Sequence, residues 1–366
     1  KAMELQIPIY FFYLVYYLLF VILLFETKVI NSTLMLYFCI FSVTPLMLNG
    51  FLFESNYMPD QHGYTSLVYD IRSFSYIGTG DPQVDFAAFI MSIFPLPFVS
   101  DVIGVSYINK FIFTIGVAWL YKKRYISGAS LWFVILYPDV ILYSSLALKD
   151  VLVMFFMLFG FIFLIRNNKV KSFMWLLPLY VIKFQNFLIS MIFYVSYFIH
   201  LKLKKTNSIF GFYVLALAVV IITSYYFIDD INNARDGMLL LDGIAHSDIV
   251  QLSTGYKLVV DGVKGAFYFL LMPFIWDANG SFQIIQSVTN IFVTLFLIAY
   301  SIKYYKLDRK KTLFWLAFLL FSMALYGVVV SNPGTGSRYR FPFIWVYVII
   351  LNIDILLNGK QPNTKR

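Results

Sequence analysis

The chain has 366 residues, of which 60% are hydrophobic, 20% are aromatic and only 13% are charged, and its mean hydropathy is +0.77. Soluble globular domains are about half apolar and about one quarter charged, so a single core cannot bury this much apolar surface. A disordered chain is also excluded, because 40 Phe and 28 Tyr residues are far too many for one. The composition therefore predicts an all-α polytopic membrane protein.

The net charge of +9 is distributed in a pattern typical of membrane topology. Short basic clusters separate the apolar runs, at 122–124, 166–171, 202–205, 303–311 and 360–366. With Lys28, this side holds 18 of the 28 basic residues and three of the 19 acidic residues, a net +15, which leaves −6 for the rest. Because basic loops stay in the cytoplasm, we expect these clusters to face it, and we expect no nucleic-acid partner.

Apolar runs predict about 11 transmembrane helices in a single domain covering 1–366, since a span needs about 20 apolar residues and fewer where helices are short. The expected spans are 7–24, 33–50, 104–121, 128–146, 151–165, 173–184, 185–199, 207–228, 284–302, 312–330 and 341–357. With the C-terminus in the cytoplasm, eleven crossings place the N-terminus on the outer side of the membrane. The outer side then carries a first loop at 51–103, with an interfacial helix near 86–98, and a second loop at 229–283 that ends in an apolar half-helix at 266–276.

The stretch 173–199 has to cross the membrane twice with about 27 residues, fewer than two full spans require. Its turn, at 183–186, is therefore expected below the outer membrane surface. Polar groups at that depth need protein, water or ligand partners, because lipid supplies none. A broken hairpin of this kind often marks a functional cavity.

Asp60 and His62 are the candidate catalytic residues of the first outer loop. A partly desolvated carboxylate at the membrane boundary is suited to act as a general base on a hydroxyl group. An Asp that follows Pro59 is equally typical of a helix cap or turn. For His62, the roles of base, pyrophosphate partner and ordinary loop residue all stay open.

Cations on the outer side run against the positive-inside pattern and are candidates for an anion site. They are Arg72, Lys149, Lys183, Arg235, Arg338 and Arg340. The planar guanidinium group of arginine can donate two parallel hydrogen bonds to phosphate oxygens, and the ammonium group of lysine attracts them as a point charge. Local pairing is the alternative for Lys149 with Asp150, and for Arg235 with Asp236 or Asp229. Arg338 and Arg340 have no acidic neighbour, and the Gly-rich turn at 332–337 before them offers backbone amides and flexibility.

Metal and thiol chemistry find little support in the sequence. The three His residues are isolated, and no His, Asp or Glu cluster has the spacing of a metal site. Cys39 is the single cysteine and lies inside an apolar run. We expect neither a metal nor a cofactor.

Four passages, in this order, resemble the bacterial glycosyltransferase C (GT-C) superfamily, and within it the O-antigen polymerases of the Wzy type. They are Pro59-Asp-Gln-His-Gly-Tyr64; Tyr137-Pro-Asp-Val-Ile-Leu-Tyr-Ser-Ser-Leu-Ala-Leu-Lys-Asp150; Gly262-Val-Lys-Gly-Ala-Phe-Tyr-Phe-Leu-Leu-Met-Pro-Phe-Ile-Trp276; and Gly336-Ser-Arg-Tyr-Arg-Phe-Pro342. They cover about 55–350. One departure is that the first long loop follows the second span, whereas many members have it after the first.

The resemblance implies an enzyme of lipopolysaccharide biosynthesis in the bacterial inner membrane, with its active site facing the periplasm. It would transfer glycan from undecaprenyl pyrophosphate to the acceptor sugar hydroxyl of another lipid-linked repeat unit, with inversion, and a chain-length regulator protein would be a candidate partner. Asp60 becomes the base. Arg338 and Arg340, with Lys149 and Arg72, become ligands of the pyrophosphate, and Lys183, Arg235 and Tyr339 complete the candidate set.

Two other functions stay open on the sequence. One is a GT-C transferase of a single sugar from polyprenyl monophosphate, in which the same Asp and Arg residues would serve. The other is a lipid-linked oligosaccharide flippase, which needs cations along a path but no base. The sequence contains no inverted repeat typical of transporters.

Overall fold

The computed structural model describes residues 2–52, 58–202, 225–240, 251–278 and 280–357. These residues form helices, turns and irregular segments, and no β-strand occurs among them. The predicted all-α class is confirmed. Several of the helices are long and apolar, as expected of a helical membrane protein.

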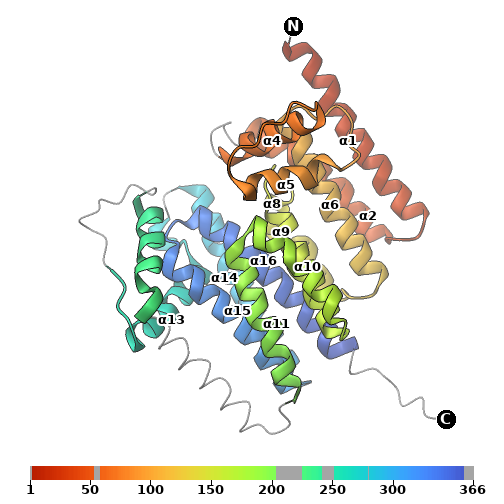
Figure 1. The fold of residues 1–366 in the computed structure, drawn as a ribbon. Coiled ribbons are helices and arrows are strands. Elements are labelled where there is room, and N and C mark those ends of the chain that lie inside the picture. Colours follow the sequence, from red (N-terminus) through yellow and green to blue (C-terminus); the bar gives the residue numbers. More distant parts are fainter. Residues whose placement is uncertain (1, 53–57, 203–224, 241–250, 279, 358–366) are drawn as a thin grey trace, which may run out of the picture. The chain divides into compact units, whose positions relative to one another are not determined.

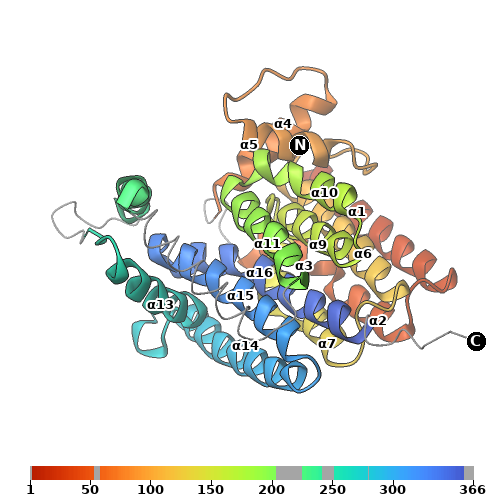
Figure 2. The ribbon, with the colours of Figure 1, turned by 60° about the horizontal axis from the view of Figure 1, so that its bottom comes forward.

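The chain divides into two compact units (Figures 1 and 2). Unit 1 contains 1–188 and 348–366, and unit 2 contains 189–347, so the boundaries fall inside α11 (Phe184–Lys202) and α16 (Pro333–Asn352). The other helices of unit 1 are α1 (Ala2–Glu26), α2 (Ser32–Ile40), η1 (Phe41–Val43), α3 (Thr44–Met47), η2 (Leu48–Leu52), α4 (Asp60–Arg72), α5 (Pro82–Ser92), α6 (Val102–Lys122), α7 (Ala129–Leu136), α8 (Pro138–Tyr143), α9 (Asp150–Ile165), α10 (Lys169–Ile182) and η5 (Ile353–Leu357). Unit 2 has a helix at 225–240, α13 (Tyr256–Leu271), η4 (Ile275–Asp277), α14 (Ser281–Tyr305) and α15 (Arg309–Val329).

Within the described part of the chain, five helical stretches are long and apolar enough to cross a membrane: Ile9–Glu26, Ser32–Leu52, Val102–Lys122, Ser281–Tyr305 and Arg309–Val329. All five match predicted spans. Two more predicted spans match the shorter apolar helices Asp150–Ile165 and Phe184–Ile199. The predicted span 207–228 lies mostly outside the described residues. The total of 11 crossings, and their orientation, stay predictions.

The run 128–146, predicted as one span, is broken in the structure. Helix α7 ends at Leu136, α8 begins at Pro138, and 144–149 form turns and bends before α9 starts. Proline has no amide hydrogen and disfavours the helical conformation of the residue before it, so Tyr137 adopts an extended backbone. We call 144–149 the unwound segment.

The predicted first loop, 51–103, contains the two helices α4 and α5, where the sequence predicted one near 86–98. Helix α4 is amphipathic, and it buries Tyr64, Leu67 and Val68 on one face. Asp81 caps the start of α5 by accepting a hydrogen bond from the Gln83 amide. Helix α5 ends at Ser92, so the Pro-rich 94–98 lies outside it.

Helix α13 is shifted toward the N-terminus relative to the predicted half-helix 266–276. It begins at Tyr256 and ends at Leu271, two residues before Pro273. It packs tightly on α15 through two glycines. A Cβ atom added to Gly265 would lie 2.8 Å from the carbonyl carbon of Gly327. Small residues allow two helix backbones to approach this closely, so neither position has room for a side chain.

Candidate functional site

The unwound segment of unit 1 is held by amide side chains from neighbouring helices. Asn109 of α6 donates to the carbonyl oxygens of Leu146 and Leu148, both at 2.6 Å, and Asn49 donates to that of Ser145 at 3.2 Å. Backbone groups outside a helix need such partners within a membrane protein, because lipid cannot supply them. Sequence reasoning missed both asparagines, although polar residues in apolar runs were the available signal.

Lys110 follows Asn109 on α6 and is completely buried inside a candidate membrane span. Its Nζ atom donates to Thr44 Oγ1 and to Ser145 Oγ, each at 3.2 Å. These hydroxyls also bond to each other at 2.6 Å. Lys110 was not among the predicted cations, because it lies in the middle of the apolar run 104–121 and not near the end of a span.

Helix α4 is fastened to the unwound segment by Gln61. The Ala147 amide donates to Gln61 Oε1 at 2.8 Å, and the Gln61 side chain is buried. On either side of it, Asp60 and His62 are exposed in the first turn of α4. A carboxylate in this turn interacts favourably with the helix dipole. Asp60 thus occupies a helix start, and it also has the solvent access that a base requires.

The predicted cations Lys149 and Lys183 both lie near the start of α9. Lys149 is the last residue of the unwound segment, and Lys183 contacts Asp150, the first residue of α9. Lys149 precedes α9 and donates to Gln83 Oε1 of α5 at 3.1 Å. Lys183 occupies the predicted break between α10 and α11, and its Nζ atom lies 3.6 Å from Oδ1 of Asp150. Both members of this ion pair are buried, and their mutual attraction offsets part of the cost of removing each charge from water.

Arg72, at the other end of α4, binds the backbone after α5. Its guanidinium donates to the carbonyl oxygens of Ser92, Phe94 and Leu96 at 3.0, 2.5 and 2.5 Å. These three bonds join α4 to the end of α5 and to the Pro-rich segment. In this structure, therefore, the predicted pyrophosphate ligand Arg72 holds the first loop together.

In unit 2, Arg340 is almost fully buried and binds the end of α13. Its Nη1 atom donates to the carbonyl oxygens of Phe269, Leu270 and Met272 at 3.0, 3.3 and 3.0 Å, and Nη2 donates to Asn290 Oδ1 at 2.6 Å. Asn290 in turn donates to Met272 O at 2.7 Å. Four hydrogen bonds to protein groups make Arg340 a link between α13, α14 and α16.

The residues before Arg340 are more accessible. Arg338 and Tyr339 are half-buried, and the Tyr339 ring lies against Tyr326 with its centroid 5.3 Å away. The Gly-rich turn is largely helical, since α16 starts at Pro333 and Asn332 Oδ1 accepts the amide of Gly334 at 2.8 Å. Of the Arg-x-Arg pair, Arg338 is thus the residue with access to solvent.

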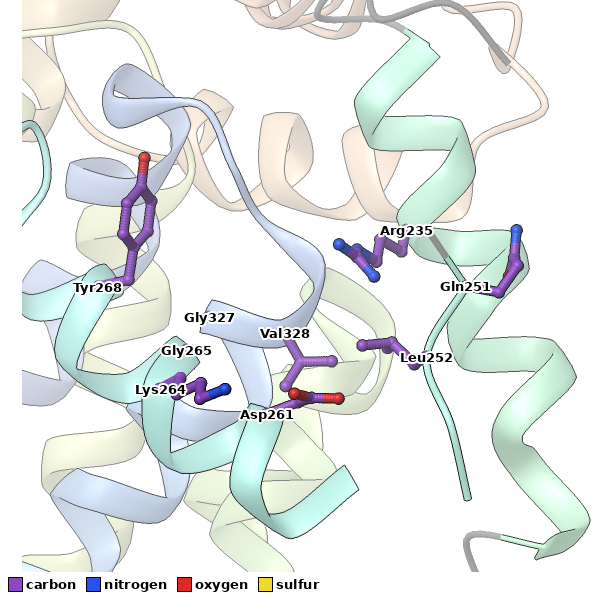
Figure 3. Close-up of a pocket in the computed structure, with 9 residues that line it drawn as sticks. All are labelled: Arg235, Gln251, Leu252, Asp261, Lys264, Gly265, Tyr268, Gly327 and Val328. Carbon is purple, nitrogen blue, oxygen red and sulfur yellow. The ribbon is translucent and has the colours of Figure 1, made fainter. Parts of the chain in front are cut away.

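Unit 2 also contains an open pocket of about 370 Å³ (Figure 3). It is lined by Arg235, Gln251, Leu252, Asp261, Lys264, Gly265, Tyr268, Gly327 and Val328. Arg235 reaches from the helix 225–240 toward α13, which carries Asp261 and Lys264. Only Arg235 was predicted from the sequence. The passage 262–276 pointed to this helix but to none of its charged side chains.

The two units offer different chemistry. Unit 1 has an exposed carboxylate beside a buried polar network, and unit 2 has an open pocket with two cations and a carboxylate. No group of three or more His, Cys, Asp or Glu side chains able to hold a metal ion occurs among the described residues.

Comparisons of the chain with protein-family models, with curated proteins and with solved structures found no match.

Proposed function

We propose that this protein is a membrane glycosyltransferase that polymerises lipid-linked polysaccharide repeat units at the outer face of the bacterial inner membrane. The donor glycan arrives on undecaprenyl pyrophosphate and passes to a sugar hydroxyl of a second lipid-linked unit. The helical membrane character of the chain and the four ordered passages that resemble O-antigen polymerases support this proposal.

The observation that carries the proposal is the bond between the Ala147 amide and Gln61 Oε1. This hydrogen bond joins the passage 59–64 to the passage 137–150, two of the four passages that carry the resemblance. Asp60 lies one residue before this contact and Lys149 two residues after it. An exposed carboxylate and a cation are thereby kept on neighbouring elements of unit 1, which is the pairing of base and anion ligand that glycosyl transfer requires.

In the proposed reaction Asp60 accepts the proton of the acceptor hydroxyl as its oxygen attacks the anomeric carbon. The bond from that carbon to the pyrophosphate oxygen breaks, and the electron pair leaves with undecaprenyl pyrophosphate. A cation stabilises the charge that grows on the leaving group, a role for which Lys149 is the candidate in unit 1. Direct displacement without a covalent intermediate inverts the anomeric centre. His62 is the candidate to orient the acceptor or to relay the proton to solvent.

The experiment is an extension assay with purified protein in detergent, supplied with lipid-pyrophosphate-linked repeat units and read as a ladder on a gel. Asp60→Asn is expected to lower the extension rate by about 10²–10⁴-fold, the usual contribution of a general base. Asp70→Asn is the matched control, since Asp70 lies on the same helix α4. It is expected to extend at close to the wild-type rate.

The alternatives give different products. Addition of one sugar without a ladder would indicate the single-sugar transferase. Intact lipid binding with no transfer by the wild type, together with movement of the lipid-linked unit across proteoliposomes, would indicate the flippase. Equal losses in Asp60→Asn and Asp70→Asn would contradict the assignment of Asp60 as the base.

A further inference from the structure

We propose that the open pocket of unit 2 binds a glycosyl phosphate, as part of a lipid-linked repeat unit. The pocket itself is a feature of unit 2 alone, whereas its assignment to a lipid-linked repeat unit rests on the proposed function. Its volume of about 370 Å³ lies toward the lower end of the range of about 300–1,000 Å³ typical of small-molecule pockets. That size suits a headgroup rather than a whole oligosaccharide.

The walls of the pocket are tied together by hydrogen bonds from Asn232 and Gln251. Asn232 exchanges two hydrogen bonds with the backbone of Leu252, accepting from its amide at 2.9 Å and donating to its carbonyl at 3.4 Å. Gln251 Nε2 donates to Asp236 Oδ2 at 2.9 Å. These bonds fix the segment that follows 250 against the helix 225–240. The wall that carries Arg235 is therefore formed before any ligand arrives.

The opposite wall is rigid for another reason. Helix α13 lies directly on α15 at Gly265 and Gly327, where no side chain separates the two backbones. Its C-terminal end is held by Arg340, which binds the carbonyl oxygens of Phe269 and Met272. Asp261 and Lys264, which line the pocket, are therefore carried by a helix whose position is fixed by its neighbours.

The lining residues match the parts of a glycosyl phosphate. Arg235 and Lys264 provide two positive charges for phosphate oxygens, and the carboxylate of Asp261 accepts hydrogen bonds from sugar hydroxyls. Tyr268 adds an aromatic face and a hydroxyl. Partial burial, and to a smaller extent the charge of Asp277, raise the pKa of Tyr268, so its hydroxyl stays protonated as a donor. A bare phosphate would leave Asp261 without a favourable partner.

The test measures binding of radiolabelled N-acetylglucosamine 1-phosphate by equilibrium dialysis, with the full-length protein in phosphatidylcholine nanodiscs. We expect saturable binding that Lys264→Ala and Arg235→Ala each weaken by about tenfold, the effect of losing one hydrogen bond to a charged group. Lys257→Ala is the matched control, because Lys257 is an exposed lysine on the same helix that does not line the pocket. It should change the affinity by less than about twofold.

Competition identifies the source of the phosphate. Undecaprenyl-pyrophosphoryl-N-acetylglucosamine should displace the probe, whereas N-acetylglucosamine, inorganic phosphate and phosphatidylglycerol should not. Equal weakening by Lys257→Ala and Lys264→Ala would overturn the proposal in favour of diffuse charge attraction. Equal competition by phosphatidylglycerol would overturn it in favour of a general phospholipid site.

The extension assay, run on the same preparations, separates this proposal from the function itself. Wild-type protein that binds the probe but forms no ladder would refute the polymerase and retain the glycosyl phosphate pocket. Wild-type protein that forms a ladder while Lys264→Ala extends equally well, despite weakened binding, would refute the assignment to a lipid-linked repeat unit alone. Asp60→Asn should bind the probe normally, since Asp60 does not line this pocket.

Discussion

The unwound segment 144–149 in unit 1 and the end of α13 in unit 2 pose the same physical problem and solve it differently. In each place backbone carbonyl groups leave the regular helix pattern inside a membrane protein. Unit 1 satisfies them with the neutral amides of Asn49 and Asn109. Unit 2 uses the guanidinium of Arg340, which binds three carbonyl oxygens.

The difference shows how a buried cation can be structural in one place and costly in another. The guanidinium group of Arg340 is surrounded by carbonyl and amide oxygens, and hydrogen bonds to these oxygens compensate for its lost hydration. Lys110 has two hydroxyls, and no ion pair involving it is found in the described part of the chain. The first cation should stabilise the fold, and the second should lower its stability.

The largest effect is expected from Arg340→Met, which removes the donor bound to Phe269 O, Leu270 O and Asn290 Oδ1, whereas Met272 O keeps its bond from Asn290. The loss should reach about 3 kcal/mol or more, since each unsatisfied buried group costs about 1–3 kcal/mol. Denaturant unfolding in detergent measures it. Arg338→Met is the control, because Arg338 is only half-buried, and it should cost less than about 1 kcal/mol. Similar losses for both would remove the distinction between the two arginines.

Asn109→Leu should have the next largest effect, because it removes two hydrogen bonds of 2.6 Å to the unwound segment. We expect a loss of about 2–3 kcal/mol in unfolding free energy. Asn109→Asp should lose at least as much, since a carboxylate cannot donate to carbonyl oxygens. A stable Asn109→Asp variant would mean that the segment finds other donors.

Gln61→Leu should cost about 1 kcal/mol of stability, the typical net value of one hydrogen bond, yet reduce extension more strongly. The reason is that Gln61 positions the first turn of α4 through the Ala147 amide. Gln61→Glu keeps an acceptor for that amide and should restore extension relative to Gln61→Leu. If both variants lose stability and activity in proportion, Gln61 has no positioning role.

The smallest effect, with the opposite sign, is expected from Lys110→Met. Replacing a buried charge by an apolar side chain of similar length often stabilises a protein, and here we expect a gain of about 1 kcal/mol. Thr44 and Ser145 keep their bonds to the carbonyl oxygens of Phe41 and Ile141. A loss of stability would show that the amine is part of a compensated network. In that case, the buried cation of unit 1 would stabilise the fold through its hydrogen-bond partners, as Arg340 does in unit 2.

Local sequence patterns predicted the apolar helices and the break at Lys183, because both depend on residues close together in the chain. They did not show which face of a helix turns inward. Arg338 and Arg340 are two positions apart, about 200° around a helix, so one is buried when the other is accessible. Which one is buried depends on the carbonyl oxygens at 269–272, and on α14 through Asn290, contacts that no local pattern contains. The partners of Lys110 and Lys183 are equally remote.

The discontinuity of unit 1 bears on how the protein is made. Asn352, near the end of α16, donates to the carbonyl oxygen of Tyr125 at 2.7 Å across 227 residues of chain. During translation the ribosome must complete all of 189–347 before this residue emerges. Until then the carbonyl oxygen of Tyr125 lacks its hydrogen bond from Asn352. The segment after 347 therefore completes a unit whose other residues are all synthesised before 189.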